Sequence, residues 1–320
     1  MTNIRKIAEM AHVSPSTVSR VLNGYAYVSK EKEEAVWKAI NETKYRKNIN
    51  AVHLSKGKTF LIGVVIPFTN HPYFGQLIEG ISEMAIEHHY NLVLFQTNYH
   101  EKKEIEALNM LKHKQIDALI ICSRTSPLKT IKEYLDYGQI VLCEDTKEKA
   151  ISSTFVDHYQ AFTMALSYLH KNKHNKIGYC IGRRSGANSQ KRERAYKDFM
   201  QRTNGQLQEN HIFEDCLYFE DGERVVNQIM EMEEPPTALL VTSDQVAAGI
   251  LVSCENRRLS VPSDLALIGF DNQPISKMMK ITTIEMNLIK IGRNLFLQAM
   301  EEQAERKKEI GVQLIERETV

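Results

Sequence analysis

The sequence has 320 residues, of which 42% are hydrophobic and 25% are charged. At about 150 residues per domain this length predicts two domains, and the composition excludes a wholly disordered chain. The longest apolar run, residues 60–68, is far shorter than the ~20 residues that cross a bilayer, so no membrane partner is expected. The first residues lack the apolar segment of a secretory signal, which predicts a cytoplasmic protein.

The side chains that support catalysis or metal binding do not form known patterns. The five cysteines are scattered and never spaced Cys-x-x-Cys, which predicts free thiols rather than disulfides or a metal site. The His170/His174 and His88/His89 pairs lack the companion ligands of metal motifs. Phosphate-loop, dinucleotide and nucleophile-elbow motifs are absent from the sequence. We therefore predict no enzyme activity, no catalytic residues, no metal and no cofactor.

Charge is distributed unevenly along the chain. Residues 1–58 hold 11 Lys and Arg and five Glu, a net charge of +6, whereas the other 262 residues hold 30 basic and 35 acidic side chains. A small basic segment on a mildly acidic body is typical of nucleic-acid binding. A solvated helical surface has the same charge pattern, so charge alone does not decide between the two.

Three short helices are predicted at the N-terminus. Apolar residues recur at helical spacing from Ile4 to Ala11, with Asn3 as the N-cap. Ser14 and Pro15 are suited to begin a second helix, which Asn23-Gly24 would end. A third helix is predicted from a Ser29 cap to about Tyr45, and Trp37, beside its inner apolar stripe, is expected in the domain core rather than at an interface. The first two helices have helix-turn-helix spacing, and the second exposes groups that reach bases and phosphates in a major groove: Ser16, Thr17 and Arg20.

The run from Ile7 to Gly24, which contains Thr-Val-Ser-Arg-Val-Leu-Asn-Gly, resembles the DNA-binding head of the lactose/galactose repressor (LacI/GalR) family. The resemblance implies that Ser16 and Arg20 read bases. It also implies that phosphates are held by Asn3, Thr17, Ser19 and Asn23. Pro15 stands where the family usually has a larger side chain.

Residues 45–54 resemble the hinge helix of the same family, although Lys47 replaces its usual proline. The resemblance implies DNA contacts for Asn48, Ala51 and Leu54, with Leu54 as an apolar wedge in the minor groove. A flexible basic linker is the alternative. Because a short isolated helix is marginal in water, we expect this segment to fold only on DNA.

From residue 60 the sequence predicts an α/β body. Apolar runs typical of strands buried on both faces alternate with helical stretches, as in doubly wound parallel sheets. The predicted strands are 60–66, 92–95, 118–122, 140–143, 176–181, 238–241 and 265–269. The predicted helices are 73–90, 103–112, 129–136, 162–171, 192–202, 223–232, 247–256 and 290–309. The last of these lacks sustained leucine heptads, which favours a dimer over a tetramer.

The resemblance continues through the body, in runs such as Ile62–Pro67 and Ile268–Asn272. It implies two doubly wound parallel-sheet lobes of periplasmic-binding-protein type, joined by three crossovers near residues 157, 287 and 311. The expected organisation is an all-α helix-turn-helix DNA-binding domain, a hinge, and an effector-binding and dimerisation domain: 1–46, 47–59 and 60–320. Within the last, the N-lobe takes about 60–157 and 288–311, and the C-lobe about 158–287.

The resemblance also indicates where an effector would bind, at the carboxyl ends of strands. The implied effector residues are Tyr73, Phe74, Arg192, Phe219, Ser243, Asp244 and Asp271. Ordinary structural roles are the alternative, because aromatic residues after strands are often core, Ser243-Asp244 suits a helix cap, and Asp271-Asn272 suits a turn. His71 and Met286 replace residues common in the family.

Together these features predict a cytoplasmic, homodimeric transcription regulator, most simply a repressor of sugar-utilisation genes. Its expected partners are a double-stranded, pseudo-palindromic DNA operator and a small effector, expected to be a carbohydrate. The alternatives are control by a purine or by a protein corepressor. A secreted sugar-binding protein fits the body but not the DNA-binding head.

Overall fold

The computed structural model describes residues 3–25, 27–46, 57–203, 207–300 and 306–320. The chain divides into two compact units, Met1–Lys58 and Thr59–Val320, which we call the head and the body. None of the helices in the described ranges is long and apolar enough to span a membrane.

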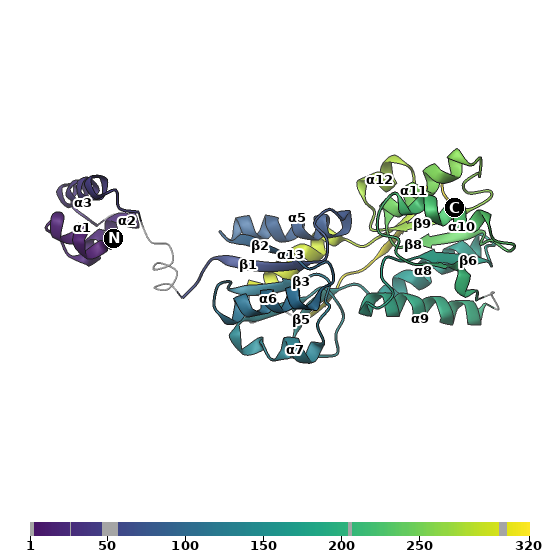
Figure 1. Ribbon diagram of the computed structural model, residues 1–320, viewed down its shortest axis with the longest axis horizontal. Coiled ribbons are helices and arrows are strands. Elements are labelled where there is room, and N and C mark those ends of the chain that lie inside the picture. Colours follow the sequence, from purple (N-terminus) through teal and green to yellow (C-terminus); the bar gives the residue numbers. More distant parts are fainter. Residues whose placement is uncertain (1–2, 26, 47–56, 204–206, 301–305) are drawn as a thin grey trace. The chain divides into compact units, whose positions relative to one another are not determined.

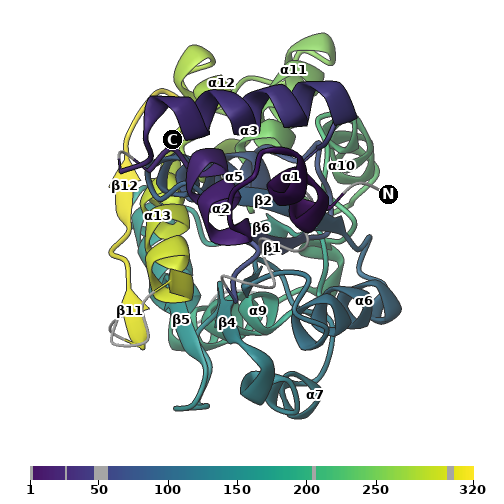
Figure 2. The same cartoon turned by 90° about the vertical axis from the view of Figure 1, so that its left-hand side faces the viewer.

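The head is a three-helix unit, α1 (Ile4–Met10), α2 (Pro15–Leu22) and α3 (Lys30–Thr43) (Figure 2). The side chain of Asn3 caps α1, and that of Ser14 caps α2, as predicted. Apolar side chains from all three helices form the head core: Ile7, Ala8, Ala11, Val18, Val21, Val36, Ala39 and Ile40. The prediction for Trp37 was wrong, because its side chain is 44% exposed; the inward stripe of α3 passes through Val36 and Ile40 instead.

The body contains two six-stranded sheets, seen side by side in Figure 1. The N-lobe sheet has the order β11-β5-β4-β3-β1-β2, and all its strand pairs are parallel. Its strands are β1 (Leu61–Ile66), β2 (Asn91–Gln96), β3 (Ala118–Ile121), β4 (Gln139–Leu142), β5 (Ser152–Phe155) and β11 (Lys307–Glu309). Its helices are α5 (Pro72–Glu87), α6 (Glu101–Lys112), α7 (Leu128–Lys132), the 3-10 helix η1 (Leu135–Tyr137) and α13 (Leu288–Met300).

The C-lobe sheet has the order β12-β10-β9-β8-β6-β7 and is parallel except for β12, which runs antiparallel to β10. Its strands are β6 (Ile177–Cys180), β7 (Ile212–Phe213), β8 (Ala238–Val241), β9 (Ala266–Phe270), β10 (Thr283–Glu285) and β12 (Gln313–Ile315). Its helices are α8 (His158–Lys171), α9 (Ala187–Arg202), the 3-10 helix η2 (Glu209–His211), α10 (Asp221–Met230), α11 (Asp244–Asn256) and α12 (Pro274–Met278). The predicted fold class, an all-α head with an α/β body of two lobes, is confirmed.

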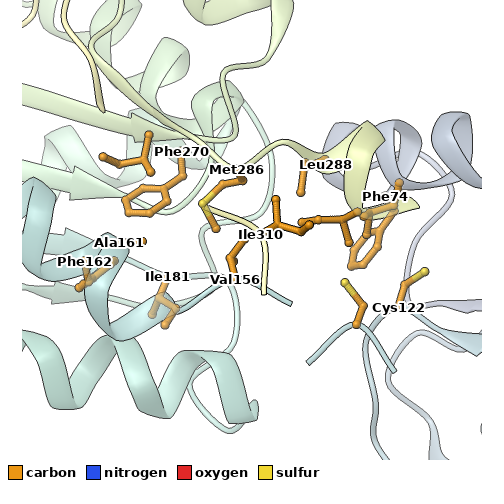
Figure 3. Packing of buried hydrophobic residues seen from close by; sticks show 14 of the residues in the cluster. Phe74, Cys122, Val156, Ala161, Phe162, Ile181, Phe270, Met286, Leu288 and Ile310 are labelled. Carbon is orange, nitrogen blue, oxygen red and sulfur yellow. The ribbon is translucent and has the colours of Figure 1, made fainter. Parts of the chain in front are cut away.

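The chain passes between the lobes three times, from β5 to α8, from β10 to α13 and from β11 to β12 (Figure 1). One apolar residue of each passage is buried: Val156, Met286 and Ile310. All three belong to one hydrophobic cluster that includes residues of both lobes, as Figure 3 shows. The three passages are therefore packed together where the two lobes meet.

One predicted helix was wrong. Residues 290–309 do not form a single helix, because the described part of helix α13 is Leu288–Met300 and Lys307–Glu309 is strand β11. The amphipathic pattern of α13 is real, since the helix packs against α5 and strands β4 and β5 (Figure 2). The charged residues that follow join the sheet because β5 offers a free parallel edge, on which Lys307 pairs with Ser153 and Glu309 with Phe155.

Candidate DNA-binding face and ligand cleft

Hydroxyl groups gather at the N-terminus of α2 in the head. Ser14 Oγ accepts a hydrogen bond from Thr17 N at 3.2 Å, while Ser16 Oγ lies at 2.7 Å and Thr17 Oγ1 at 2.9 Å from the same oxygen. Pro15 occupies the first helical position, where its missing N–H costs no hydrogen bond. This helix end therefore presents small polar groups and a positive dipole to its surroundings.

One face of α2 packs against the other two helices of the head, and the opposite face is exposed to solvent. Val18 and Val21 are buried against α1 and α3, whereas Ser16, Arg20 and Asn23 are exposed and Thr17 and Ser19 are half-buried. Within the described part of the chain, Arg20 has no ion pair. Asn3 is exposed, and its Oδ1 accepts from Lys6 N at 3.0 Å. Hence α2 offers an unpaired guanidinium and small polar groups on one surface.

The hinge residues expected to contact DNA, Asn48, Ala51 and Leu54, lie outside the described residues.

A cleft of about 900 Å³ of empty space, partly open to solvent, lies between the N-lobe and the C-lobe. Its walls follow the carboxyl ends of strands in both sheets, where parallel α/β sheets bind their ligands. The N-lobe contributes His71, Tyr73, Phe74, Tyr99, Ile121, Cys122, Ser123, Arg124, Cys143 and Glu144. The C-lobe contributes Ile181, Gly182, Arg183, Gly186, Ala187, Asn188, Ser189, Arg192, Cys216, Leu217, Thr242, Ser243 and Asp271.

Three polar atoms on the C-lobe wall are buried and have no hydrogen-bond partner among the described residues: Arg192 Nε, Ser243 Oγ and Asp271 Oδ1. Each belongs to a residue expected to bind an effector, and the structure brings all three to one cleft. Arg192 Nη2 lies 3.2 Å from His158 Nδ1, and Asp271 Oδ2 accepts from Gln273 Nε2 at 3.0 Å. Unpaired buried groups are costly, so a ligand with complementary donors and acceptors would be stabilised here.

Burial governs the electrostatics of this wall. It raises the pKa of Asp271 well above its usual range, and the neighbouring carboxyl of Asp244 raises it further. Burial lowers the pKa of the Arg192 guanidinium and, together with the Arg192 charge, holds the pKa of His158 well below its usual range. His158 is therefore neutral and can accept a hydrogen bond from Arg192 through Nδ1.

The N-lobe wall is mainly apolar. Tyr73 and Phe74 meet edge to face with ring centroids 5.0 Å apart at the start of α5. Burial is the main cause of the strongly raised pKa of Tyr73 and of the raised pKa of the Cys143 thiol, which is about 12. Arg124 and Glu144 also line this wall, where they pair at 2.7 Å. Aromatic faces opposite fixed polar groups are typical of sites for small polar molecules.

Two residues expected at the effector do not line the cleft. Asp244 is fully buried, where Oδ1 accepts from Thr283 Oγ1 at 2.6 Å and Oδ2 from Gln273 N at 2.7 Å. Its carboxylate therefore ties the start of α11 to neighbouring segments. Phe219 is 38% exposed, and its backbone packs against Gly249 of α11. Their positions do not support direct effector contacts.

Several contacts across the cleft were not foreseen. Lys191 Nζ pairs with Asp145 at 2.6 Å, and the Arg183 guanidinium lies 3.9 Å from the centre of the Tyr99 ring. His71 hydrogen-bonds to the backbone of Leu217, and burial lowers its pKa to about 4. These pairs join residues far apart in sequence, so no local pattern pointed to them.

Among the described residues, no three His, Cys, Asp or Glu side chains are grouped so that they could hold a metal ion.

Two family models match the chain. The model of bacterial regulatory proteins of the lacI family matches residues 3–48, and that of periplasmic binding proteins and the sugar binding domain of the LacI family matches residues 59–318. Together they span the three-helix head and both lobes of the body.

Whole-chain comparisons agree. The chain is 40% identical over 323 residues to an uncharacterized HTH-type transcriptional regulator, YkvZ, of Bacillus subtilis (strain 168), with 100% of both chains covered. It is 37% identical to the NTD biosynthesis operon regulator NtdR of the same organism, covering 94% of this chain and 92% of the relative. The structure of a LacI family transcriptional regulator from Lactobacillus casei with bound glucose matches with a TM-score of 0.74 and 25% identity, over 81% of this chain and 99% of that one. The resemblance is thus confirmed: the chain belongs to the LacI family of bacterial regulatory proteins and is a DNA-binding transcriptional regulator with a ligand-binding domain.

Proposed function

We propose that this protein is a cytoplasmic, homodimeric repressor of sugar-utilisation genes whose affinity for its operator is set by a small ligand in the cleft. Control by a ligand is supported by one observation. Three buried polar atoms without a partner among the described residues lie on the wall of a cleft of about 900 Å³: Arg192 Nε, Ser243 Oγ and Asp271 Oδ1. Closed lobes would leave these groups unsatisfied, whereas a bound polyol would satisfy them.

In the head, α2 would enter the major groove, with Arg20 and Ser16 reading base edges. Phosphates would be held by Asn3, Thr17, Ser19 and Asn23. The exposure of Arg20 without an ion pair, and the hydroxyl cluster at the N-terminus of α2, support these roles. Two heads of a dimer would occupy half-sites about one helical turn apart on a pseudo-palindromic operator, with Asn48, Ala51 and Leu54 at its centre.

In the cleft, Arg192 and Asp271 would form paired hydrogen bonds with neighbouring sugar hydroxyls, and Ser243 would hold a third. The bonds donated by the Arg192 guanidinium would be charge-assisted, and such bonds are stronger than bonds between neutral groups. Tyr73 and Phe74 would cover the apolar face of the sugar ring. The Lactobacillus casei regulator has been solved with bound glucose and with bound sucrose, which supports a carbohydrate as the class of ligand.

Coupling would use the three passages between the lobes. A ligand that contacts both walls would bind the closed arrangement of the lobes more tightly than the open one. The difference between these two binding free energies sets how far the ligand shifts the equilibrium towards closure. Closure would change the separation of the two chains where they lead into the paired hinge segments, and with it the affinity of the heads for DNA.

The test measures operator affinity against ligand. An operator is first obtained by selection from random duplex DNA, and its affinity is then followed by fluorescence anisotropy with monosaccharides, disaccharides and purine bases. We expect a sugar to change the affinity at least tenfold in the wild-type protein, and the effect to be lost in Arg192→Ala. A response to a purine alone, or only after a protein corepressor is added, would contradict the carbohydrate assignment.

A further inference from the structure

Two cysteines of the C-lobe lie in contact with each other. Cys180 is the last residue of β6, and Cys216 follows β7 in the loop that leads to α10. This loop returns to β6, because Cys216 N donates to the Ile181 carbonyl at 3.1 Å. Both side chains belong to one apolar cluster, and the two thiols share a hydrogen bond. Both cysteines are free, so the pair is a dithiol.

The Cys216 sulfur also has the cleft and a cation as neighbours. The residue lines the cleft, and Nη2 of Arg224 in α10 lies 3.7 Å from its Sγ. The guanidinium is fixed in this place, because the same nitrogen donates to the Glu214 and Asp215 carbonyls at 2.9 Å and 3.1 Å. Cys180, in contrast, is fully buried. A small solute in the cleft therefore meets Cys216 first.

The surroundings give the two thiols different reactivity. Burial raises the pKa of Cys180 well above its usual range. The hydrogen bond from Cys180 and the charge of Arg224 lower the pKa of Cys216, against the opposing effect of burial. Because the thiolate is the nucleophile, Cys216 is the reactive member of the pair and Cys180 the thiol that stands ready beside it.

The other three cysteines lack this arrangement. Cys122 and Cys143 follow the paired strands β3 and β4 and line the opposite wall of the cleft. Burial is the main cause of the raised pKa of both thiols, which is about 12 at Cys143. Burial also raises the pKa of Cys254 in α11 to about 11. These thiols stay protonated at neutral pH, so a mild oxidant should select Cys216.

The loop that carries Cys216 reaches across to the N-lobe. The backbone of the next residue, Leu217, hydrogen-bonds to His71. The Tyr218 ring follows, with its centroid 6.3 Å from that of His71 and 6.4 Å from that of Phe68. A displacement of Cys216 would therefore be passed on to a contact between the lobes.

We propose that Cys180 and Cys216 form a peroxide-sensitive thiol pair, whose oxidation to a disulfide moves the Cys216 loop and weakens its contact with the N-lobe. The Cys216 thiolate attacks one oxygen of hydrogen peroxide, the O–O bond breaks, and the leaving hydroxide takes up a proton to become water. The Cys180 sulfur then attacks the sulfur of the Cys216 sulfenic acid. The S–S bond forms, the S–O bond breaks, and the hydroxide leaves with the Cys180 proton as a second water. The two thiols lose two electrons, and one peroxide is reduced.

Formation of this bond requires the loop to move. A disulfide holds its sulfur atoms about 2.05 Å apart, which is much closer than two thiols that share a hydrogen bond. Cys180 is anchored, because β6 lies between β7 and β8 in the sheet, so the displacement falls on Cys216 and its loop. Thiol–disulfide exchange with a reduced dithiol would restore the starting state. The inference goes beyond the proposed function and does not depend on it, since neither the thiols nor the contact involves a ligand or DNA.

Disulfide mapping tests the chemistry. Reduced full-length protein is treated with a small excess of hydrogen peroxide, free thiols are blocked with N-ethylmaleimide, and unreduced peptides are identified by mass spectrometry. The variants are Cys180→Ala, Cys216→Ser and, as a control from the same apolar cluster, Cys254→Ala. We expect a peptide that joins Cys180 to Cys216 in the wild type and in Cys254→Ala. In Cys180→Ala, dimedone should instead trap a sulfenic acid at Cys216.

Hydrogen exchange measured by mass spectrometry tests the link to the N-lobe. Reduced and oxidised wild-type proteins are compared without ligand or DNA, with peroxide-treated Cys216→Ser as the control. Oxidation should speed amide exchange at least about threefold in peptides that cover 214–222 and 68–75, because these segments open more readily once their contact is weakened. The control should show no change in either segment.

The outcomes separate the two parts of the proposal. Peroxide that leaves Cys216 unmodified, or that produces crosslinks of Cys122, Cys143 or Cys254, would overturn the thiol pair. A disulfide between Cys180 and Cys216 with unchanged exchange at residues 68–75 would overturn the link to the N-lobe. Both failures leave the proposed function standing, because that function is tested by ligand-dependent operator binding.

Discussion

Replacing Arg192 by alanine separates ligand binding from folding. Among the described residues, the Arg192 guanidinium has one neighbour in hydrogen-bonding distance, His158 Nδ1 at 3.2 Å, while its Nε is buried and has no partner there. Removing an unsatisfied donor offsets the loss of one hydrogen bond, so we expect the free energy of unfolding to change by less than about 1 kcal/mol. Urea denaturation measures this directly.

The same change should severely weaken ligand binding. Each hydrogen bond to a charged group contributes about 1.5–3 kcal/mol, and a guanidinium that meets neighbouring hydroxyls makes two. The expected loss is therefore about 3–6 kcal/mol, or a factor of at least ~100 in affinity. Calorimetry with the ligand found in the screen measures the loss. Arg194→Ala, whose side chain is 76% exposed two residues along the same helix, is the control and should bind as the wild type does.

Operator affinity without ligand should be the same in Arg192→Ala as in the wild type, because the residue lies in the body. Ligand affinity within about threefold of wild type in a folded Arg192→Ala protein would refute the assignment of the cleft. Loss of ligand binding together with a large loss of stability would instead show that the guanidinium supports the fold, contrary to the hydrogen-bond count.

Three further predictions concern the head, the N-lobe and pH. Arg20→Ala should weaken operator binding by about 1–3 kcal/mol and relax sequence preference, as anisotropy with operator and scrambled duplexes would show; unchanged preference would contradict base reading. Gly80→Ala should destabilise the body by about 1–3 kcal/mol in urea, because its Cβ would lie 2.0 Å from the Ile289 carbonyl oxygen, whereas Gly75→Ala on the same helix meets nothing within 4 Å and should not. The pKa of His71 is lowered from 6.5 to about 4, so the unfolded chain binds a proton at this residue before the folded protein does as the pH falls. The contribution of neutral His71 to the free energy of unfolding is therefore intact above pH 6.5. About 3 kcal/mol of that contribution is lost by pH 4. In His71→Gln, the free energy of unfolding should vary less with pH between 6.5 and 4 than in the wild type. The same pH dependence in both proteins would contradict this role of His71.

Strands buried on both faces could be predicted because their sequences are continuous apolar runs. β1, β3 and β8 are of this kind, and their predicted and observed ranges agree within one residue or so. β5 and β11 could not be found in this way, since Ser-Ser-Thr-Phe and Lys-Lys-Glu have no apolar pattern. They are strands because β11 pairs with β5, Lys307 with Ser153 at a separation of 154 residues, and β5 also pairs with β4; local propensity does not predict such long-range pairing.

In the candidate site, too, some residues could be predicted from the sequence and others could not. Asp271 directly follows β9, and Arg192 lies in the second turn of α9, where the family resemblance placed an effector-binding arginine; both line the cleft. Arg183 and Tyr99 were missed, because their contact joins a loop of one lobe to a loop of the other. Asp244 was placed at the ligand because it follows β8, yet its carboxylate turns inward to Thr283 and the Gln273 backbone. Sequence position located the correct edge of the sheet but not the direction of each side chain.

The most direct test of the central claim is selection of binding sites from a random duplex DNA pool by the purified full-length protein. Near-physiological salt is required, because weak phosphate contacts alone are then suppressed. The account predicts enrichment of a pseudo-palindrome with half-sites about one turn apart, lost in Arg20→Ala. A wild-type pool that stays random, with and without the sugars and purine bases of the screen, would contradict sequence-specific operator binding.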